Sequence, residues 1–441
     1  MSILIRNGTI VTANIRGDIH SNASILIEND RIASISSEGT THDGGNIIDA
    51  SGYVIIPGFV QTHIHLCQTL FRGLADDLEL LEWLKNKIFP MESAHNENSM
   101  YVSAKLGIAE LIRSGSTTIL DMGSIHYEEE VIRAIGETGL RAFVGKAMMD
   151  VNDIFPTLCE STNHALRSTR ELAERHHNSY NGRIMYAVAP RFVLSCSDSL
   201  LQGAQEMLSN FPGMLFHTHA SENKNEIKAV HERCKMENIE FLHHRGLLSN
   251  RSCLAHCVHL NKNEMDILQS TETNVSHCPS SNLKLGSGVA PIPTYISRGI
   301  NVTLGADGAP CNNSLNMFQE MRLASLIQKS AHGPTSMAAK VVFEMATRGG
   351  AKALGLEHEV GTIEVGKKAD LVLLDLNRLW NPLMQEDRLF SSIVYSAGAE
   401  NVDSVMIDGK WVYRKKELIG VDEHTLVESG AKELKNLLNR L

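Results

Sequence analysis

Eight strand-like runs alternate with helical stretches after Pro57, and this alternation restricts the fold more than any other feature of the sequence. Eight parallel strands, each followed by a helix, are typical of a (β/α)8 barrel of mixed α/β class. The strand-like runs are FVQTHIHL, TTILDMG, RAFVGKAMMD, RIMYAVAP, MLFHTHAS, SCLAHCVHL, TNVSHCPS and NVTLGADG. The segments expected to be helical are 97–113, 127–138, 164–176, 198–208 and 223–234, with two more at 314–330 and 336–354.

The two ends of the chain predict a second, smaller domain. Residues 1–56 contain short apolar runs separated by Asn-Gly, Asn-Asp and Gly-Gly turn signals, and strand-like runs return after Gly361. Neither set has enough strands to enclose a core alone. We therefore expect 1–56 and 361–423 to form one small β-sandwich beside a barrel of residues 57–360, followed by a C-terminal helix at 424–441.

Composition excludes several functional classes. The net charge of −10 gives no electrostatic reason to expect nucleic acid or an anionic membrane as a partner. No apolar run approaches the ~20 residues that span a bilayer, and the first residues lack the pattern of a secretory signal. The eight cysteines include no Cys-x-x-Cys pair. We therefore expect a cytoplasmic protein with reduced thiols.

Histidines and one aspartate gather at the C-terminal ends of the predicted barrel strands, where barrel active sites lie. His63 and His65 stand two apart in the first strand and so face the same side. His219 ends the fifth strand and Asp307 ends the eighth. Three imidazoles and a carboxylate suit one divalent transition metal per chain, zinc or alternatively iron, and leave a position for water. Such an ion lowers the pKa of its water toward ~7, which makes hydroxide available at neutral pH.

Further side chains are expected to act beside this metal. Glu222, three residues after His219, would carry a proton from the attacking water to the leaving group. His256, in the sixth strand, would hold or deprotonate the water, and His277, in the seventh, would face the tetrahedral centre of the reaction. Asp307 is expected to serve catalysis as well as metal binding.

Simpler explanations exist for three of these neighbouring residues. A carboxylate in the first turn of a helix is favoured by the helix dipole, which is the alternative explanation of Glu222. His217 shares the face of His219 but lies one layer deeper, so we expect a hydrogen-bonded histidine of the barrel core. His259 alternates to the other face of its strand and is expected to be structural.

Together these motifs resemble the amidohydrolase superfamily over essentially the whole chain. The resemblance points to the mononuclear-metal aminohydrolase branch, because no lysine stands at the end of the fourth strand to be carbamylated, and APRFVLS has Arg191 there. The segments that carry it are PGFVQTHIHL, HTHASE, AHCVHL, SHCPSSNLKLGSG, LGADGAPCNNSLNMFQEMRLASL and GTIEVGKKADLVLLD.

Within that branch the chain looks most like the methylthioadenosine/S-adenosylhomocysteine deaminases and the 5′-deoxyadenosine deaminases, through TLFRGLADDLELLEWLKNKIFPME. The resemblance implies that Glu92 accepts hydrogen bonds from the ribose hydroxyls, the alternative being a helix-start carboxylate. It also implies that Trp83, Lys146 and Arg191 bind substrate. The family has arginine at the position of Lys146 and histidine at that of Arg191.

The activity implied is hydrolytic deamination of an amino-substituted purine by metal-bound hydroxide. An adenosine-type nucleoside, namely 5′-deoxyadenosine, methylthioadenosine or S-adenosylhomocysteine, would give the inosine analogue and ammonia. Arg191 within APRF also resembles guanine deaminases, so guanine or an amino-triazine is the alternative substrate. His277, which the triazine chlorohydrolases lack, favours C–N over C–Cl hydrolysis.

A catalytically inactive binding barrel is the remaining alternative to an enzyme. The family resemblance also implies a homo-oligomer, either a dimer or a tetramer.

Overall fold

The computed structural model describes residues 2–37, 45–153, 155–379 and 385–441. Its residues group into two compact units. The first comprises 1–61, 109–118 and 316–422, and the second comprises 62–108, 119–315 and 423–441. The domain boundaries expected after residues 56, 360 and 423 stay a prediction.

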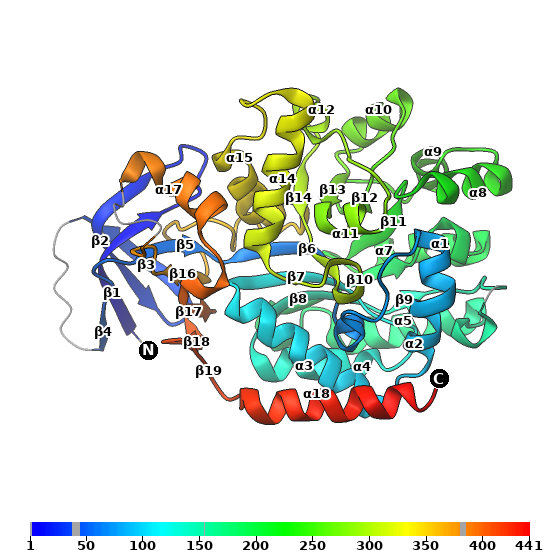
Figure 1. The fold of residues 1–441 in the computed structure, drawn as a ribbon, viewed down its shortest axis with the longest axis horizontal. Helices are drawn as coiled ribbons and strands as arrows, with labels where there is room; N and C mark the ends of the chain where they lie inside the picture. The colour runs from blue at the N-terminus through cyan, green and yellow to red at the C-terminus, as the bar shows by residue number, and fades with distance from the viewer. Residues whose placement is uncertain (1, 38–44, 154, 380–384) are drawn as a thin grey trace. The chain divides into compact units, whose positions relative to one another are not determined.

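A parallel sheet forms the barrel, and all eight expected strands contribute to it (Figure 1). Its strand order is β14-β13-β12-β11-β10-β8-β7-β6-β15, with the short β9 (Ala147–Met148) pairing with β10. This order follows the chain and confirms the predicted (β/α)8 fold. The strands are β6 (Phe59–His65), β7 (Ser116–Met122), β8 (Arg141–Gly145), β10 (Ile184–Pro190), β11 (Leu215–Ala220), β12 (Ser252–His256), β13 (Asn274–His277), β14 (Val302–Leu304) and β15 (Asp307–Gly308).

The eighth barrel strand is divided into two pieces that close the sheet. β14 pairs with β13, whereas β15 pairs with β6. Gly305, between the pieces, passes so close to His63 that a Cβ at this glycine would lie 2.8 Å from the His63 Cβ and carbonyl oxygen. A residue without a side chain is required for this approach. Closure of the barrel thereby brings Asp307 beside the first strand.

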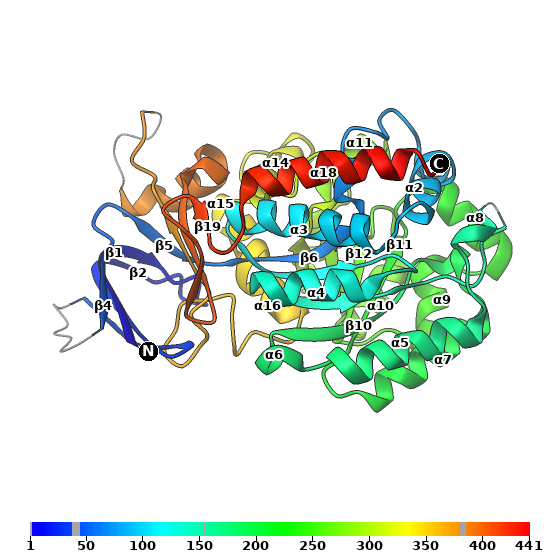
Figure 2. The same ribbon diagram turned by 90° about the horizontal axis from the view of Figure 1, so that it is seen from below.

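Helices of the second unit pack against these strands, as the periodicity of the sequence predicts. Helix α4 (Glu128–Thr138) packs on β8, and α5 (Thr162–His176) and α7 (Asp198–Asn210) pack on the outside of β10 (Figure 2). Ser161 and Ser197 cap α5 and α7 by accepting backbone N–H groups, which satisfies donors that a helix start leaves free. The other helices named by the sequence are α3 (Glu97–Arg113), α8 (Lys224–Cys234), α14 (Met317–His332), α15 (Ala339–Glu344) and α18 (Glu423–Leu438).

The first unit contains a second sheet that joins the two ends of the chain, as expected for the small β-domain. Strand β5 (Val54–Pro57) pairs in parallel with β1 (Ser2–Val11) and antiparallel with β16 (Leu371–Leu374). Its core contains Leu371 and Met406 packed with the buried isoleucines of β1 and β2, which are Ile3, Ile5, Ile10, Ile25 and Ile27. The remaining strands are β2 (Ile19–Glu28), β3 (Arg31–Ser36), β4 (Asn46–Asp49), β17 (Val402–Ile407), β18 (Lys410–Arg414) and β19 (Glu417–Leu418).

The structure bears on whether the chain crosses a membrane and on the state of its cysteines. Among the described residues, no helix has the combination of length and apolar character that crossing a bilayer requires. All eight cysteines are free thiols. The expected cytoplasmic location and homo-oligomeric state stay predictions.

Candidate active site

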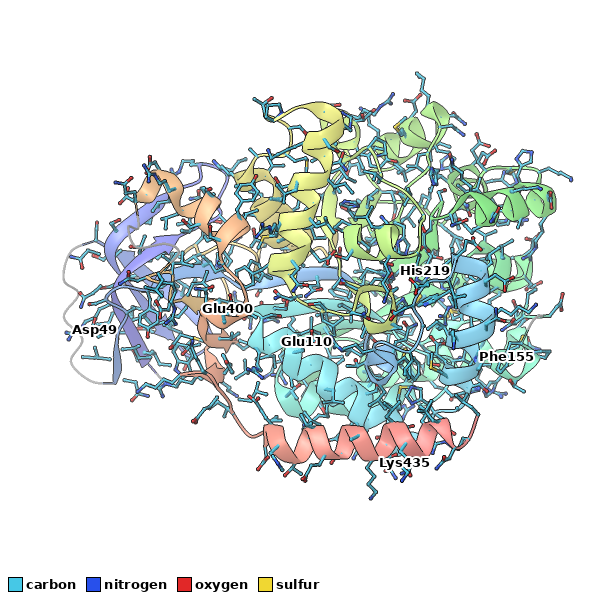
Figure 3. The ribbon with its side chains drawn as sticks, viewed as in Figure 1. Asp49, Glu110, Phe155, His219, Glu400 and Lys435 are labelled. Carbon is cyan, nitrogen blue, oxygen red and sulfur yellow. The ribbon has the colours of Figure 1, made fainter. Side chains whose placement is uncertain are left out.

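Four side chains that are distant in the sequence converge at one end of the barrel. His63 and His65 come from β6, His219 from β11 and Asp307 from β15, and their ligand atoms all lie within 4.8 Å of one another (Figure 3 labels His219). Asp307 Oδ1 lies 3.2 Å from His63 Nε2 and 3.3 Å from His65 Nε2, and the Nε2 atoms of His65 and His219 are 3.2 Å apart. The structure thus assembles the four residues expected to hold a metal.

Backbone carbonyls determine which ring nitrogen of His65 and His219 carries the proton. His65 Nδ1 lies 2.7 Å from the Met122 carbonyl oxygen, and His219 Nδ1 lies 2.6 Å from that of Arg191. A carbonyl oxygen only accepts, so both Nδ1 atoms are donors. In the neutral rings the Nε2 lone pairs therefore face the centre of the cluster, which is the form that a metal ligand requires.

His217 orients the third imidazole. Its Nδ1 donates to the Cys253 carbonyl oxygen over 2.7 Å, and its Nε2 lies 2.9 Å from His63 Nδ1. Burial holds the pKa of His217 well below its ordinary value, so the ring is neutral and Nε2 accepts the proton of His63 Nδ1. His217 is the hydrogen-bonded core histidine that the sequence predicts, and it leaves the His63 Nε2 lone pair directed at the cluster.

The cluster fits a divalent cation. Three Nε2 lone pairs and one carboxylate converge, and His63 Nε2 is buried without a hydrogen-bond partner. Burial lowers the pKa of His63 to about 4, which makes it a neutral ligand. Burial also acts to lower the pKa of His65, but Asp307 outweighs it and raises that pKa, so the cluster attracts positive charge. Nitrogen and carboxylate donors in this number are those of zinc or iron sites.

The carboxylate of Asp307 is held by neighbouring donors and by an unusual backbone conformation. Ser281 Oγ donates to Oδ2 over 2.6 Å, and the Gly308 N–H donates to Oδ1 over 2.7 Å. Asp307 has φ +64° and His256 has φ +71°, a region that residues with side chains rarely adopt. Such strain gathers at functional sites, where the surrounding structure maintains it.

Glu222 and His256 face each other beside the cluster. Glu222 Oε2 lies 3.5 Å from His256 Nε2, which is also 3.8 Å from Asp307 Oδ2. His256 Nδ1 is 2.9 Å from Asn282 Oδ1, so it donates there and turns Nε2 toward Glu222. Burial raises the pKa of the Glu222 carboxyl, which brings it closer to the range where a group both accepts and releases protons.

Glu226 supports Glu222 and was not identified from the sequence. Its Oε2 accepts the Glu222 backbone N–H over 3.0 Å, and its Oε1 accepts Asn238 Nδ2 over 2.9 Å. Burial raises the pKa of Glu226 to about 8. Its position four residues after Glu222, in the first turn of α8, is the one signal that could have drawn attention to it.

His277 is buried close to the end of β13 with neither ring nitrogen hydrogen-bonded. Burial lowers its pKa to about 3, so it is neutral. It is not among the residues that line the cavity over the metal-ligand cluster. Its expected role at the tetrahedral centre of the reaction stays a prediction.

A cavity opens over the cluster, and the empty space within it and at its opening to solvent is about 450 Å³. Trp83 and Arg191, both expected to bind substrate, lie in its wall, and the Trp83 indole Nε1 has no hydrogen-bond partner. Gln68, which the sequence did not suggest, also lies there. Apolar side chains supply much of the remaining wall, which suits a flat ring system; they are Leu80, Leu84, Phe192 and Leu285.

Glu92, the expected partner of a ribose, is engaged by other side chains. Arg191 Nη1 and Nη2 donate to Glu92 Oε2 and Oε1 over 2.6 and 3.0 Å, and Gln68 Nε2 donates to Oε1 over 2.8 Å. Glu92 is 1% exposed and is not a lining residue of the cavity. Contact between Glu92 and a ribose therefore stays a prediction.

Lys146 lies elsewhere. It forms an ion pair with Glu160, and both line a separate open cleft together with His126, Glu128 and other residues. The structure does not bring Lys146 into the wall of the cavity over the cluster, because β8, which precedes it, directs it toward α5.

A sequence profile of the amidohydrolase family matches residues 54–412. The chain belongs to the amidohydrolase family. Its matched segment contains every one of the cluster residues and the whole set of barrel strands.

Several proteins named as deaminases are similar to this chain along nearly their full length. The chain is 41% identical to the 5′-deoxyadenosine deaminase of Methanothermobacter thermautotrophicus, over 98% of this chain and 99% of that protein. It is 36% identical to the 5-methylthioadenosine/S-adenosylhomocysteine deaminase of Desulforudis audaxviator, over 99% of both chains. A solved structure of an adenosine deaminase from Xanthomonas campestris with bound zinc superposes with a TM-score of 0.92 at 29% identity, covering 99% of this chain and 98% of that one.

Proposed function

We propose that this amidohydrolase is a metal-dependent aminohydrolase that deaminates an adenosine-type nucleoside. The observation that carries the proposal is the convergence of three imidazole lone pairs and the Asp307 carboxylate next to a buried acid, Glu222, under a largely apolar cavity. His63, His65, His219 and Asp307 would hold one divalent ion. Zinc is the ion that the donor set and the zinc-bearing adenosine deaminase favour, with iron as the alternative. When bound, such an ion supplies a Lewis acid and lowers the pKa of a coordinated water.

The residues around the cluster are suited to move the protons of a hydrolytic deamination. Water adds to the ring carbon that bears the amino group, the carbon–nitrogen bond breaks, and ammonia leaves. Glu222 would accept a proton from the attacking water and deliver one to the leaving nitrogen. His256, held by Asn282, presents Nε2 toward Glu222 and Asp307 and would help to orient the water. His277, neutral and unpartnered, would face the tetrahedral carbon.

The cavity supports a purine as the substrate. Its apolar side chains would contact the faces of the ring, and the unpartnered indole N–H of Trp83 is available to an acceptor atom. The nucleoside assignment rests on the deaminases to which the chain is similar along its full length. Arg191 in the cavity wall is the observation that favours the second candidate, a guanine or amino-triazine deaminase.

Metal analysis combined with an ammonia-release screen tests the proposal. The purified protein should contain about one transition-metal ion per chain, as a site of four protein ligands implies. It should release ammonia from at least one of adenosine, 5′-deoxyadenosine, methylthioadenosine and S-adenosylhomocysteine. Turnover of guanine or melamine-type triazines alone would replace the nucleoside by the second candidate. A site that stays empty after metal loading would indicate an inactive barrel.

A further inference from the structure

We propose that the Arg191–Glu92 ion pair makes the cavity select nucleosides whose 5′ substituent is small and uncharged, and reject those with an amino-acid tail. This inference rests on the proposed function, since it concerns the substrate of the same site.

The cation in the cavity wall is already neutralised by the protein. Among the described lining residues, Arg191 is the one arginine or lysine. Its two terminal nitrogens both donate to the carboxylate of Glu92, and the two residues are 3% and 1% exposed. A bidentate pair this far from water has little net charge to offer a third group.

The ion pair is also held in place on both sides. Gln68 Nε2 donates to Glu92 Oε1, and the guanidinium carbon of Arg191 lies 5.2 Å from the centre of the Phe89 ring. If Arg191 turned toward an anionic ligand, the Glu92 carboxylate would be left buried without its counter-ion, which is strongly unfavourable. Each terminal nitrogen of Arg191 nevertheless keeps a second N–H, which suits neutral acceptors such as a hydroxyl or ring nitrogen.

The other groups around the cavity also disfavour a carboxylate tail. Glu222, Glu226 and Asp307 line the same cavity, and none of them supplies a positive charge with which the carboxylate of the tail could pair. Lys146, which the family resemblance suggested as a substrate-binding residue, is paired with Glu160 in the separate cleft. The apolar wall instead offers contact to a methyl or methylthio group.

The test compares specificity constants for 5′-deoxyadenosine, methylthioadenosine, S-adenosylhomocysteine and a neutral 5′-alkylthio analogue as long as the homocysteine tail. The neutral analogue separates the effect of charge from that of size. We expect kcat/KM for S-adenosylhomocysteine to lie at least about tenfold below that for the neutral long analogue, because the charged groups of its zwitterionic tail must lose water in a cavity that offers the carboxylate no unpaired cation. Equal or higher kcat/KM for S-adenosylhomocysteine would overturn the inference.

The variant Glu92→Gln removes the compensating charge while it keeps the shape of the side chain. We expect the ratio of kcat/KM for S-adenosylhomocysteine to that for the neutral analogue to rise at least about tenfold, because Arg191 then becomes an uncompensated cation. Glu160→Gln is the matched control, since it frees Lys146 in the other cleft, and the ratio should not change. If Glu92→Gln fails to fold, Arg191→Gln serves instead, and it should alter turnover of both nucleosides alike.

The outcomes separate this inference from the proposed function. A metal-loaded protein that releases no ammonia from any nucleoside contradicts the proposed function itself. A protein that deaminates all four nucleosides equally, or that loses S-adenosylhomocysteine selectively in Arg191→Gln, contradicts only the selectivity proposed here.

Discussion

His63 Nδ1 lies 2.9 Å from His217 Nε2, and His217 in turn donates to the Cys253 carbonyl oxygen. This relay decides that His63 Nε2 carries a lone pair. His65 and His219 obtain the same tautomer from carbonyl oxygens directly. His217, which lies between His63 and the Cys253 carbonyl oxygen, is therefore a component of the proposed metal site, although both of its ring nitrogens are used within the protein.

Replacement of His217 should weaken metal binding. His217→Leu removes the acceptor for His63 Nδ1, and loss of such an orienting partner lowers metal affinity by about 10–100-fold. Competition with a chelator measures the affinity, and thermal unfolding shows whether the barrel is intact. His217→Gln offers a replacement acceptor and should restore part of the affinity. A folded Leu variant that binds metal as tightly as the parent would contradict the relay.

Loss of a ligand should cost both metal and turnover. His63→Ala or Asp307→Ala removes one of four groups that converge on the same point, so the metal content after dialysis should fall together with activity. Elemental analysis of the purified variants provides the measurement. The assignment of the site is wrong if folded His63→Ala retains its full metal content and full activity.

Glu222→Gln should separate chemistry from metal binding. Glutamine keeps the volume of the side chain but carries no proton, and positioned acid–base groups contribute about 10²–10⁴-fold to rate. We expect kcat to fall within that range while the metal content is unchanged. Glu171→Gln, on the exposed side of α5, is a control for the same substitution. Activity within ~3-fold of the parent would refute the proton-carrying role, being far less than acid–base catalysis contributes.

His256 and His277 should affect turnover without affecting the metal. His256 Nε2 faces Glu222 and Asp307 rather than the shared centre of the four ligands, and both nitrogens of His277 are unpartnered. The Asn variant of either residue should lower kcat and leave the metal content at the parental value. Loss of the metal from one of these variants would make that histidine a ligand.

Glu264 should make the stability of the second unit depend on pH. Burial raises its pKa from 4.5 to about 7, so between these values the folded state binds more protons than the unfolded state. Stability contributed by this group is complete below pH 4.5 and is lost as the pH rises through 7, by up to ~1 kcal/mol per pH unit. Glu264→Gln should flatten the decline of the melting temperature between pH 5 and 7. If the melting temperatures of the parent and of Glu264→Gln decline equally over this pH range, the assignment of the pH dependence to Glu264 is wrong.

Much of the site could be predicted because its residues stand at the ends of barrel strands, which lie close together in this fold. His63, His65, His219 and Asp307 each stand at the C-terminal end of a strand-like run, and parallel strands of a closed barrel bring those ends to one edge. Local periodicity is enough to find such runs, because alternation along a strand depends only on neighbouring residues. The fold, the cluster and the placement of Glu222 beside it therefore follow from the sequence.

The tertiary structure alone decided which charged side chains pair. Glu92 and Arg191 are 99 positions apart, and no local pattern indicates that the carboxylate is occupied by Arg191 and Gln68. Lys146 was expected to bind substrate, as Arg191 was, but it lies in the separate cleft with Glu160. Such pairings depend on the directions of side chains from different elements and on the burial that removes competing water. The sequence pattern determines where a strand ends. The packing of elements that are distant in the sequence determines which charged side chains pair in the interior.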